Sequence, residues 1–239
     1  RRRFFDRPQV RYVFAVPAGR VVALLRLSRG GIGLFRPHPT SQATELASRV
    51  GQIRHVALAD GSTVTLDTDS VLRIAFTGTE RRLYLSRGRA RFVVAHDAAR
   101  PFVVIAGNGS VTARGTIFDV AVTDNRVKVV LLRGVIEVRG GRASADTSQP
   151  AIARLSPGQQ ISFGTIEPLV APQPAAAIDA RWTAGMLSFD STRLADAIAQ
   201  ANRYSTARIS LADSALGDLR ITGAFHVGDA VGLAESIAE

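Results

Sequence analysis

Hydrophobic and polar residues alternate along much of the chain after Val50. An alternation with a period of two is typical of β-strands that bury one face. Turn sequences such as Asp60-Gly61 and Gly107-Asn108-Gly109 separate the alternating segments, and glycine tolerates the positive φ of tight hairpin turns. No helical stripe of useful length appears between Gly51 and Phe163, so this part is predicted to be all-β, a sandwich, a roll or a solenoid-like fold. The apolar positions expected to face inward are Val56/Leu58, Val64/Leu66, Leu72/Ile74/Phe76, Leu83/Leu85, Ala90/Phe92/Val94, Phe102/Val104/Ala106, Val111/Ala113, Phe118/Val120/Val122, Val127/Val129/Leu131 and Ile161/Phe163.

The last 60 residues show a different pattern. A strand is predicted at Met186-Leu187-Ser188-Phe189, followed by a helix that Asp190 or Ser191 would cap. Two further strands are predicted, at Ile209-Ser210-Leu211 and from Leu219 through Phe225, and a second helix is predicted to start at Asp229. This order indicates a small α+β module, and we expect it to be a truncated one that lacks a pairing strand after Glu239.

Four parts are expected along the chain. Residues 1–40 form a basic arm or a degenerate membrane segment, and residues 41–165 form the all-β domain. A Pro/Ala linker covers residues 166–180, and the α+β module covers residues 181–239. Arginines interrupt the apolar run between residues 12 and 35, and each costs about 2.5–3.5 kcal/mol at the centre of a membrane helix.

Composition narrows the function classes. The net charge of +10 resides mainly in residues 1–40, which hold nine arginines against Asp6, so the folded body is not predicted to bind nucleic acid. No cysteine is present, and the four histidines lack the short paired spacing of metal ligands. The acidic residues are scattered at turns and are interpreted as solvated, and no catalytic constellation stands out. We therefore expect a protein that is not an enzyme and that carries no cofactor and no metal.

Six segments in order resemble the FecR family of inner-membrane sensors, which couple TonB-dependent outer-membrane siderophore receptors to extracytoplasmic-function sigma factors. The segments are Leu58-Ala59-Asp60-Gly61-Ser62 with Val64 and Leu66, Leu85 with Gly88, Ala90, Phe92 and Val94, Arg100-Pro101-Phe102-Val103-Val104, Val111 to Val120, Arg133-Gly134-Val135-Ile136-Glu137-Val138, and Leu155-Ser156-Pro157-Gly158-Gln159. The tail from Trp182 to Ala238 is similar to the C-terminal module of the same family, which is related to the short N-terminal domain of secretins and TonB-dependent receptors. Its likeness rests on Trp182, Gly185, Leu187, Phe189, Leu194, Ile198, Ile209 and Gly223.

The resemblance implies an anti-sigma regulator in the bacterial cell envelope, anchored in the inner membrane with a periplasmic C-terminal part. Its implied partners are the signalling domain of a TonB-dependent receptor and, through a cytoplasmic domain, a sigma factor. No sigma-binding domain is recognisable in this sequence, so sigma control is the weaker expectation. The alternative is a structural or glycan-binding β-domain of the envelope without a signalling role.

A partner strand could add to an open strand edge of the α+β module, because unpaired backbone N–H and C=O groups template pairing. The predicted edge residues are Ile209, Ser210, Leu211, Leu219, Arg220, Ile221 and Thr222. The alternative interpretation of both segments is that they are ordinary internal strands.

Overall fold

The structure is a computed structural model, and it describes residues 44–124, 126–144, 147–164, 169, 171–175 and 177–238. The predictions for the basic arm and for the membrane segment at residues 12–35 lie outside these residues. Within the described ranges, no helix combines the length and the apolar character that a membrane span requires.

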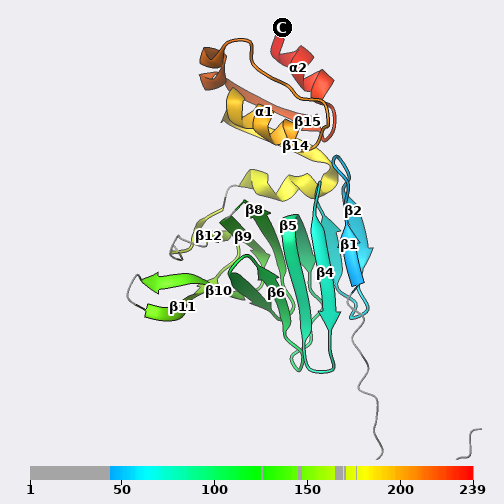
Figure 1. Cartoon of the computed structure of the whole chain (residues 1–239), viewed down its shortest axis with the longest axis vertical. Coiled ribbons are helices and arrows are strands. Elements are labelled where there is room, and N and C mark those ends of the chain that lie inside the picture. The colour runs from blue at the N-terminus through cyan, green and yellow to red at the C-terminus, as the bar shows by residue number, and fades with distance from the viewer. Residues whose placement is uncertain are drawn as a thin grey trace, which may run out of the picture. The chain divides into compact units, whose positions relative to one another are not determined.

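Thirteen strands form one curled sheet, drawn from blue to yellow-green in Figure 1. Its central order is β11-β10-β7-β6-β5-β8-β9-β12-β13. The strands β4 and β3 also pair with the long strand β5, and they pair on their other sides with β1 and β2, respectively. The parallel pairing of β5 with β6 is the exception in an otherwise antiparallel sheet. The strands are β1 (Thr44–Ala47), β2 (Arg54–Ala57), β3 (Thr63–Leu66), β4 (Val71–Phe76), β5 (Arg81–Val93), β6 (Phe102–Ala106), β7 (Gly109–Ala113), β8 (Ile117–Thr123), β9 (Arg126–Arg133), β10 (Ile136–Ser144), β11 (Thr147–Leu155), β12 (Gln159–Gly164) and β13 (Gln173–Pro174).

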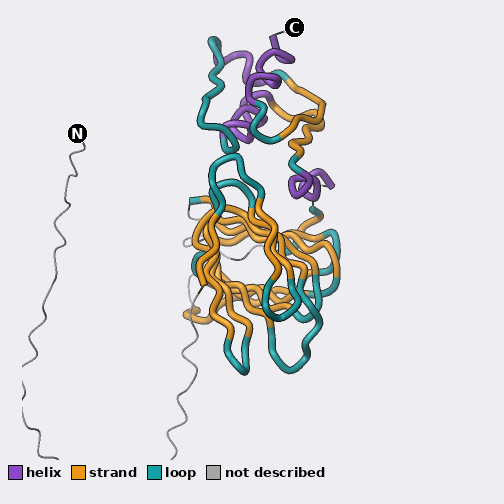
Figure 2. Tube along the Cα trace, turned by 90° about the vertical axis from the view of Figure 1, so that its right-hand side faces the viewer, coloured by secondary structure: helices purple, strands orange, loops and turns teal. Residues whose placement is uncertain are grey.

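The sheet curls because β5 belongs to two layers. Its first half pairs with β4 and β6, and its second half, from Gly88 on, pairs with β3 and β8. Gly88 has a φ of +83°, and a Cβ placed there would lie 2.2 Å from the hydroxyl of Ser70. The bend therefore requires glycine at this position. Figure 2 shows the strands curling around a common centre.

That centre is filled by the side chains that the alternation predicted to face inward. Phe92, Phe102 and Phe118 are fully buried. The ring of Phe92 lies 5.8 Å from that of Phe102 and 5.2 Å from that of Phe118, so the three rings pack as one aromatic group. The prediction of a mainly β fold with a small α+β module is confirmed.

The C-terminal module, residues 177–238, packs two helices against a two-stranded antiparallel sheet. Its core consists of Leu187 and Phe189 from the sheet with Ala197, Ala201 and Leu233 from the helices, together with Tyr204. The predicted boundary between linker and module stays a prediction. The strand β13 and the beginning of the first 3₁₀ helix fall within residues 166–180, the range predicted to be linker. The elements are η1 (Ala177–Ala184), β14 (Met186–Arg193), α1 (Leu194–Asn202), η2 (Ser214–Asp218), β15 (Arg220–His226) and α2 (Ala230–Ala238).

Two local predictions in this module are wrong. Asp190 and Ser191 do not cap a helix: both lie in β14, where Ser191 has a φ of +46° and donates its backbone N–H to Thr222 Oγ1 at 2.9 Å. The helix α1 begins only after Arg193, and no side chain caps it. The helix start predicted at Asp229 is confirmed: α2 begins at Ala230, and Asp229 Oδ1 accepts the backbone N–H of Gly232 at 2.9 Å, as a capping side chain does.

The second wrong prediction is a strand at Ile209–Leu211. These residues form no ladder; instead the side-chain amide of Asn202 bonds both backbone groups of Ile209, its Oδ1 accepting the N–H at 2.8 Å and its Nδ2 donating to the carbonyl at 2.9 Å. A side chain therefore takes the place of a neighbouring strand here.

Candidate functional site

The open edge of the C-terminal module is the first candidate site. Within the described residues, β14 and β15 pair only with each other. At one end of the β14–β15 ladder, the N–H of Leu194 donates to the Leu219 carbonyl. At the other end, the N–H of Val227 donates to the Gly185 carbonyl, so both of these residue pairs are hydrogen-bonded pairs. Because bonded and non-bonded pairs alternate in an antiparallel ladder, the intervening backbone groups that face away from β14 can be assigned. They belong to Arg220, Thr222, Ala224 and His226, and all four side chains are exposed.

The structure gives the predicted edge residues different surroundings. Arg220 and Thr222 present backbone groups at the free edge, while their side chains bond the bulge of β14 through Ser191: Arg220 Nη1 donates to the Ser191 carbonyl, and Thr222 accepts the Ser191 N–H. Ile221 is half-buried against the module core. Leu219 is exposed and accepts the first N–H of α1. The role of these residues in partner binding stays a prediction.

Ile209, Ser210 and Leu211 lie apart from that edge. Ile209 packs against the module core, and its backbone groups are bonded by Asn202. Ser210 is exposed and Leu211 is half-buried. The structure therefore does not present this segment as a second strand edge.

A second site, missed by the sequence reasoning, is a buried contact between the curled sheet and the C-terminal module. We call it the junction. It is formed by Asp67, Arg89, Arg91, Asp119, Trp182 and Tyr204.

One half of the junction centres on Asp67, which directly follows β3 and is fully buried. Its Oδ2 accepts hydrogen bonds from Arg89 Nε at 2.8 Å and from the Tyr204 hydroxyl at 2.9 Å. Arg89 Nη2 also donates to the Tyr204 hydroxyl at 2.9 Å, so the three groups form a closed network. Asp67 and Tyr204 are 137 residues apart in the chain.

The other half centres on Asp119 in β8. Arg91 binds it in a bidentate pair, with Nε 2.6 Å from Oδ1 and Nη2 2.8 Å from Oδ2. The indole N–H of Trp182 donates to Oδ2 at 2.9 Å. The Trp182 ring also lies over the guanidinium of Arg89, whose central carbon is 4.4 Å from the ring centroid. One aromatic side chain of the module therefore contacts both arginines of the sheet.

Burial fixes the protonation states in the Asp67 half. Burial, with Asp67 beside the hydroxyl, raises the pKa of Tyr204 to about 12, so the hydroxyl keeps its proton at neutral pH and donates it to Asp67. Burial alone would lower the pKa of Arg89, but the charge of Asp67, the neighbouring Tyr204, the hydrogen bond to Asp67 and the charge of Asp119 together outweigh this effect and hold the pKa above its ordinary value. Arg89 therefore stays charged and Tyr204 stays protonated across the neutral range.

The backbones also approach closely beside the junction. Gly51 has a φ of +78°, and a Cβ added there would lie 2.8 Å from the backbone carbonyl oxygen of Tyr204. Thr68 Oγ1 accepts the Gly51 N–H and donates to the Arg203 carbonyl at 3.1 Å. The end of α1 is therefore held against the loop after β1 by a close backbone approach and by the Thr68 hydroxyl, in addition to the hydrogen bond from Tyr204 to Asp67.

The interpretation of the acidic residues as solvated is wrong for three of them. Asp67 and Asp119 are buried in the junction. Asp60 lies in the predicted turn, but its side chain is buried against Arg81, with Nη1 2.8 Å from Oδ2. Burial opposes ionisation of Asp60, but hydrogen bonds from Ser62 and Arg81 outweigh it and lower the pKa of its carboxyl.

Comparison with known proteins agrees with this architecture. Two crystal structures, at 2.50 and 1.65 Å resolution and both described as "a putative anti-sigma factor from Parabacteroides distasonis ATCC 8503", share the fold with TM-scores of 0.61 and 0.62. Each is 24% identical in sequence, and the alignments cover 82% and 81% of this chain and 90% of each compared chain. None of the curated proteins matches the sequence.

The family comparison covers the curled sheet. Residues 44–150 match the FecR family, which is described as "FecR protein". The match includes five of the six ordered motifs and all of the strands from β1 to β10. It supports a regulatory, non-enzymatic role. The curled sheet of this chain belongs, over residues 44–150, to the FecR family.

Proposed function

We propose that this chain is a signal-transducing regulator of the anti-sigma type in the bacterial cell envelope, and that it relays the occupancy of a TonB-dependent outer-membrane receptor to an extracytoplasmic-function sigma factor. The described part would lie in the periplasm, and the protein would be held at the inner membrane. The family match supports the regulatory role.

The observation that carries the proposal is the free edge of β15. Four alternate residues of β15 direct their backbone groups away from β14, and within the described residues no strand pairs with this edge. A receptor signalling domain that offers an edge strand of its own would complete this sheet by strand addition. Main-chain bonds would supply affinity, and the side chains beside the edge would supply specificity.

The junction gives such a binding event a route to the curled sheet. The module is tied to the buried ion pairs of the curled sheet through the hydrogen bonds of Tyr204 and Trp182 and through the Trp182 ring, so a force on the module acts on the curled sheet. A flexible tether would not transmit orientation in this way.

The edge can be tested by removing one outward N–H. Replacing Ala224 by proline removes a donor that faces away from β14, and proline is tolerated on strand edges. We expect Ala224→Pro to weaken capture of the signalling domain of the cognate TonB-dependent receptor by about tenfold or more, since a lost hydrogen bond and a steric block add.

The matched control is Ala224→Val, which keeps the N–H and favours a strand. Capture is measured by biolayer interferometry with the immobilised 239-residue chain, and the circular dichroism spectrum checks the fold of both variants. Equal affinity of the proline and valine variants for the receptor domain would refute pairing at this edge.

A further inference from the structure

We propose that a pocket beside the free edge of β15 receives a tyrosine side chain of the strand that adds there. The pocket has a volume of about 450 Å³, within the range of small-molecule sites. Its lining includes Arg181, Ser188 and Asp190 as well as Thr222 and Ala224 of β15, and we call it the edge pocket. The inference rests on the proposed function, because it names a specificity determinant of the same strand edge.

Strand register places the edge pocket on the face of the two-stranded sheet that lies opposite the module core. Leu187 and Phe189 of β14 are buried in that core, so Ser188 between them is directed to the other face. Ser188 pairs with Ala224 of β15, whose exposed side chain therefore lies on the same outer face. Both side chains are small, and a hollow forms at this position of the sheet.

An added strand would place one of its side chains directly beside this hollow. The backbone groups of Ala224 face away from β14, so a residue of the added strand would pair with Ala224. Side chains of paired residues lie on the same face, with Cβ atoms about 4.5–5.5 Å apart. Because Ala224 is short, a long side chain of the added strand can extend over it toward Ser188.

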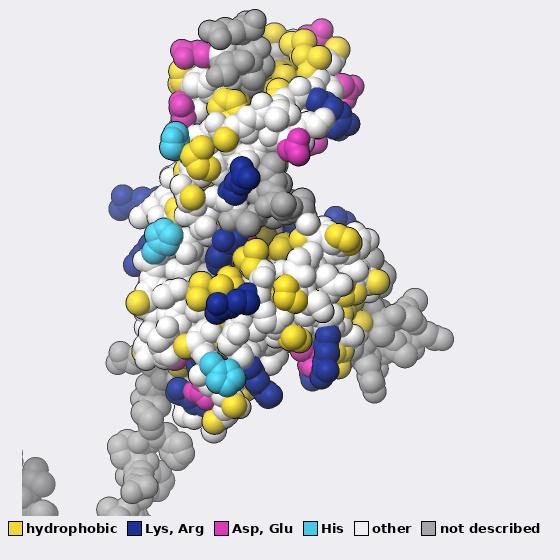
Figure 3. Space-filling view, turned by 180° about the vertical axis from the view of Figure 1, so that it is seen from behind, with side chains coloured by type: hydrophobic (Ala, Val, Ile, Leu, Met, Phe, Trp, Pro, Cys, Tyr) yellow, Lys and Arg dark blue, Asp and Glu magenta, His cyan; other side chains and the backbone are white. Residues whose placement is uncertain are grey.

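The overall charge of the module does not select a partner side chain. Residues 181–239 carry five basic and seven acidic side chains, which nearly balance. Figure 3 shows acidic, basic and hydrophobic side chains together on the surface of the module. Selection at the edge pocket therefore depends on the groups that line it.

Two exposed charged groups of the lining are uncommitted. Within the described part of the chain, the side chains of Arg181 and Asp190 form neither an ion pair nor a hydrogen bond. The hydroxyl oxygen of Ser188 is buried and has no hydrogen-bond partner among the same residues. The edge pocket thus offers a cation, an anion and a hydroxyl to an incoming side chain.

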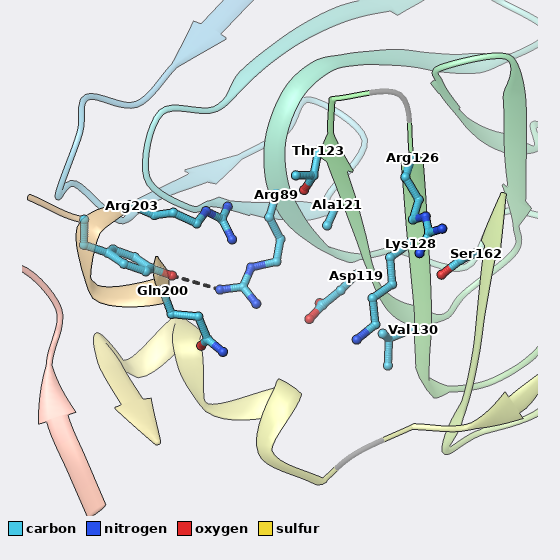
Figure 4. A pocket seen from close by; sticks show the side chains of 11 residues that line it. Arg89, Asp119, Ala121, Thr123, Arg126, Lys128, Val130, Ser162, Gln200 and Arg203 are labelled. Atoms are coloured by element: carbon cyan, nitrogen blue, oxygen red, sulfur yellow. Dashed lines mark hydrogen bonds between the residues drawn. The ribbon is translucent and has the colours of Figure 1, made fainter. Parts of the chain in front are cut away.

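A phenol matches this combination. Its hydroxyl can accept a hydrogen bond from a guanidinium and can donate its own proton to a carboxylate. The junction already contains this arrangement: the Tyr204 hydroxyl accepts from Arg89 and donates to Asp67, each at 2.9 Å. Figure 4 draws the bond to Arg89 as a dashed line.

Other long side chains satisfy less of the lining. Phenylalanine covers the hollow but leaves the polar groups of the lining without a partner. Glutamate is attracted by Arg181 and repelled by Asp190, and lysine experiences the opposite pair of forces. Tyrosine combines an apolar ring over Ala224 with a polar end, and it supplies a large contact area at a low cost in conformational entropy.

The test uses the full 239-residue chain and NMR titration with N-acetyltyrosinamide, which presents the tyrosine side chain without a strand. N-acetylphenylalaninamide is the matched probe without the hydroxyl. We expect saturable shifts of the backbone amides of Ser188 and Ala224 with a Kd on the order of 1 mM for the tyrosine probe. The phenylalanine probe should bind at least about fivefold more weakly, because it makes no hydrogen bond to the charged groups.

The variant that probes the site is Arg181→Gln with Asp190→Asn, which removes both free charges and keeps the net charge. We expect it to lower the affinity for the tyrosine probe by about fivefold or more, to the level of the phenylalanine probe. Arg193→Gln with Asp218→Asn is the matched control, because it removes an exposed ion pair of the same module outside the pocket and should leave the affinity unchanged. Asp190→Asn alone is a second probe if the double variant does not fold.

Competition links the edge pocket to the strand edge. The tyrosine probe at saturating concentration should weaken capture of the receptor signalling domain, and the phenylalanine probe at the same concentration should weaken it less. Undiminished capture in the presence of bound tyrosine probe would overturn the assignment of this pocket to the added strand.

The fragment titration separates the failure of this inference from the failure of the proposed function. Lack of receptor capture by the unmodified chain contradicts the proposed function, whereas the fragment titration needs no receptor. Equal affinities of the two probes, or an equal loss of affinity in the pocket variant and in its control, would overturn the tyrosine pocket even if the receptor domain is captured.

Discussion

Replacing Asp119 with alanine is expected to lower the free energy of unfolding by about 3–5 kcal/mol, the cost of removing one member of a buried ion pair. The Asp119 side chain is 5% exposed and that of Arg91 is 14% exposed, so water screens the pair little. The substitution leaves the Arg91 guanidinium and the Trp182 indole N–H without their acceptor. Urea unfolding followed by circular dichroism measures the change.

Trp182 provides an independent signal for the same variant, because it is the single tryptophan of the chain. Its emission should shift to the red in Asp119→Ala under native conditions if the indole becomes hydrated. Asp218→Ala is the matched control, since it breaks the exposed ion pair with Arg193 and should change stability little. A stability loss in Asp119→Ala no larger than in this control would contradict the description of the junction.

Replacing Trp182 with alanine is the second change with a large expected effect, about 3–5 kcal/mol of unfolding free energy. The indole is 3% exposed and contacts Asp119 and both junction arginines. Trp182→Phe keeps a ring over the arginines but removes the N–H, so it should cost clearly less, about 1.5–3 kcal/mol for a hydrogen bond to a charged group.

Limited proteolysis separates the two tryptophan variants. Loss of the ring should release the C-terminal module, so Trp182→Ala should be cut between the curled sheet and β14 faster than the phenylalanine variant. Identical cleavage rates and stabilities for both variants would mean that the ring does not hold the module to the sheet.

The local pattern of the sequence was sufficient to predict that residues 51–163 are all-β. Period-two alternation depends only on which strand positions face a core, and Phe92, Phe102 and Phe118 are buried together as expected. The same alternation marks Arg91 and Asp119 as outward-facing. It does not show that another part of the chain covers that face, so the sequence alone indicates solvated side chains for both acids of the junction.

Contacts between distant residues account for the other differences. The helix start predicted at Asp190 or Ser191 fails because Thr222, 31 residues later, bonds the Ser191 backbone and holds it in a strand bulge. The strand predicted at Ile209–Leu211 fails because one asparagine side chain satisfies the backbone of Ile209.

Residue-resolved hydrogen exchange by NMR, with and without the cognate receptor signalling domain, tests the central claim most directly. The backbone amides of Thr222 and Ala224 face away from β14 and should exchange fast in the free chain. The amides of Ile221 and Gly223 are directed at β14 and should be slow in both states. Strand addition predicts that the complex slows Thr222 and Ala224 selectively; a complex in which these two amides keep their free exchange rates, or in which protection appears only on the curled sheet, would contradict it.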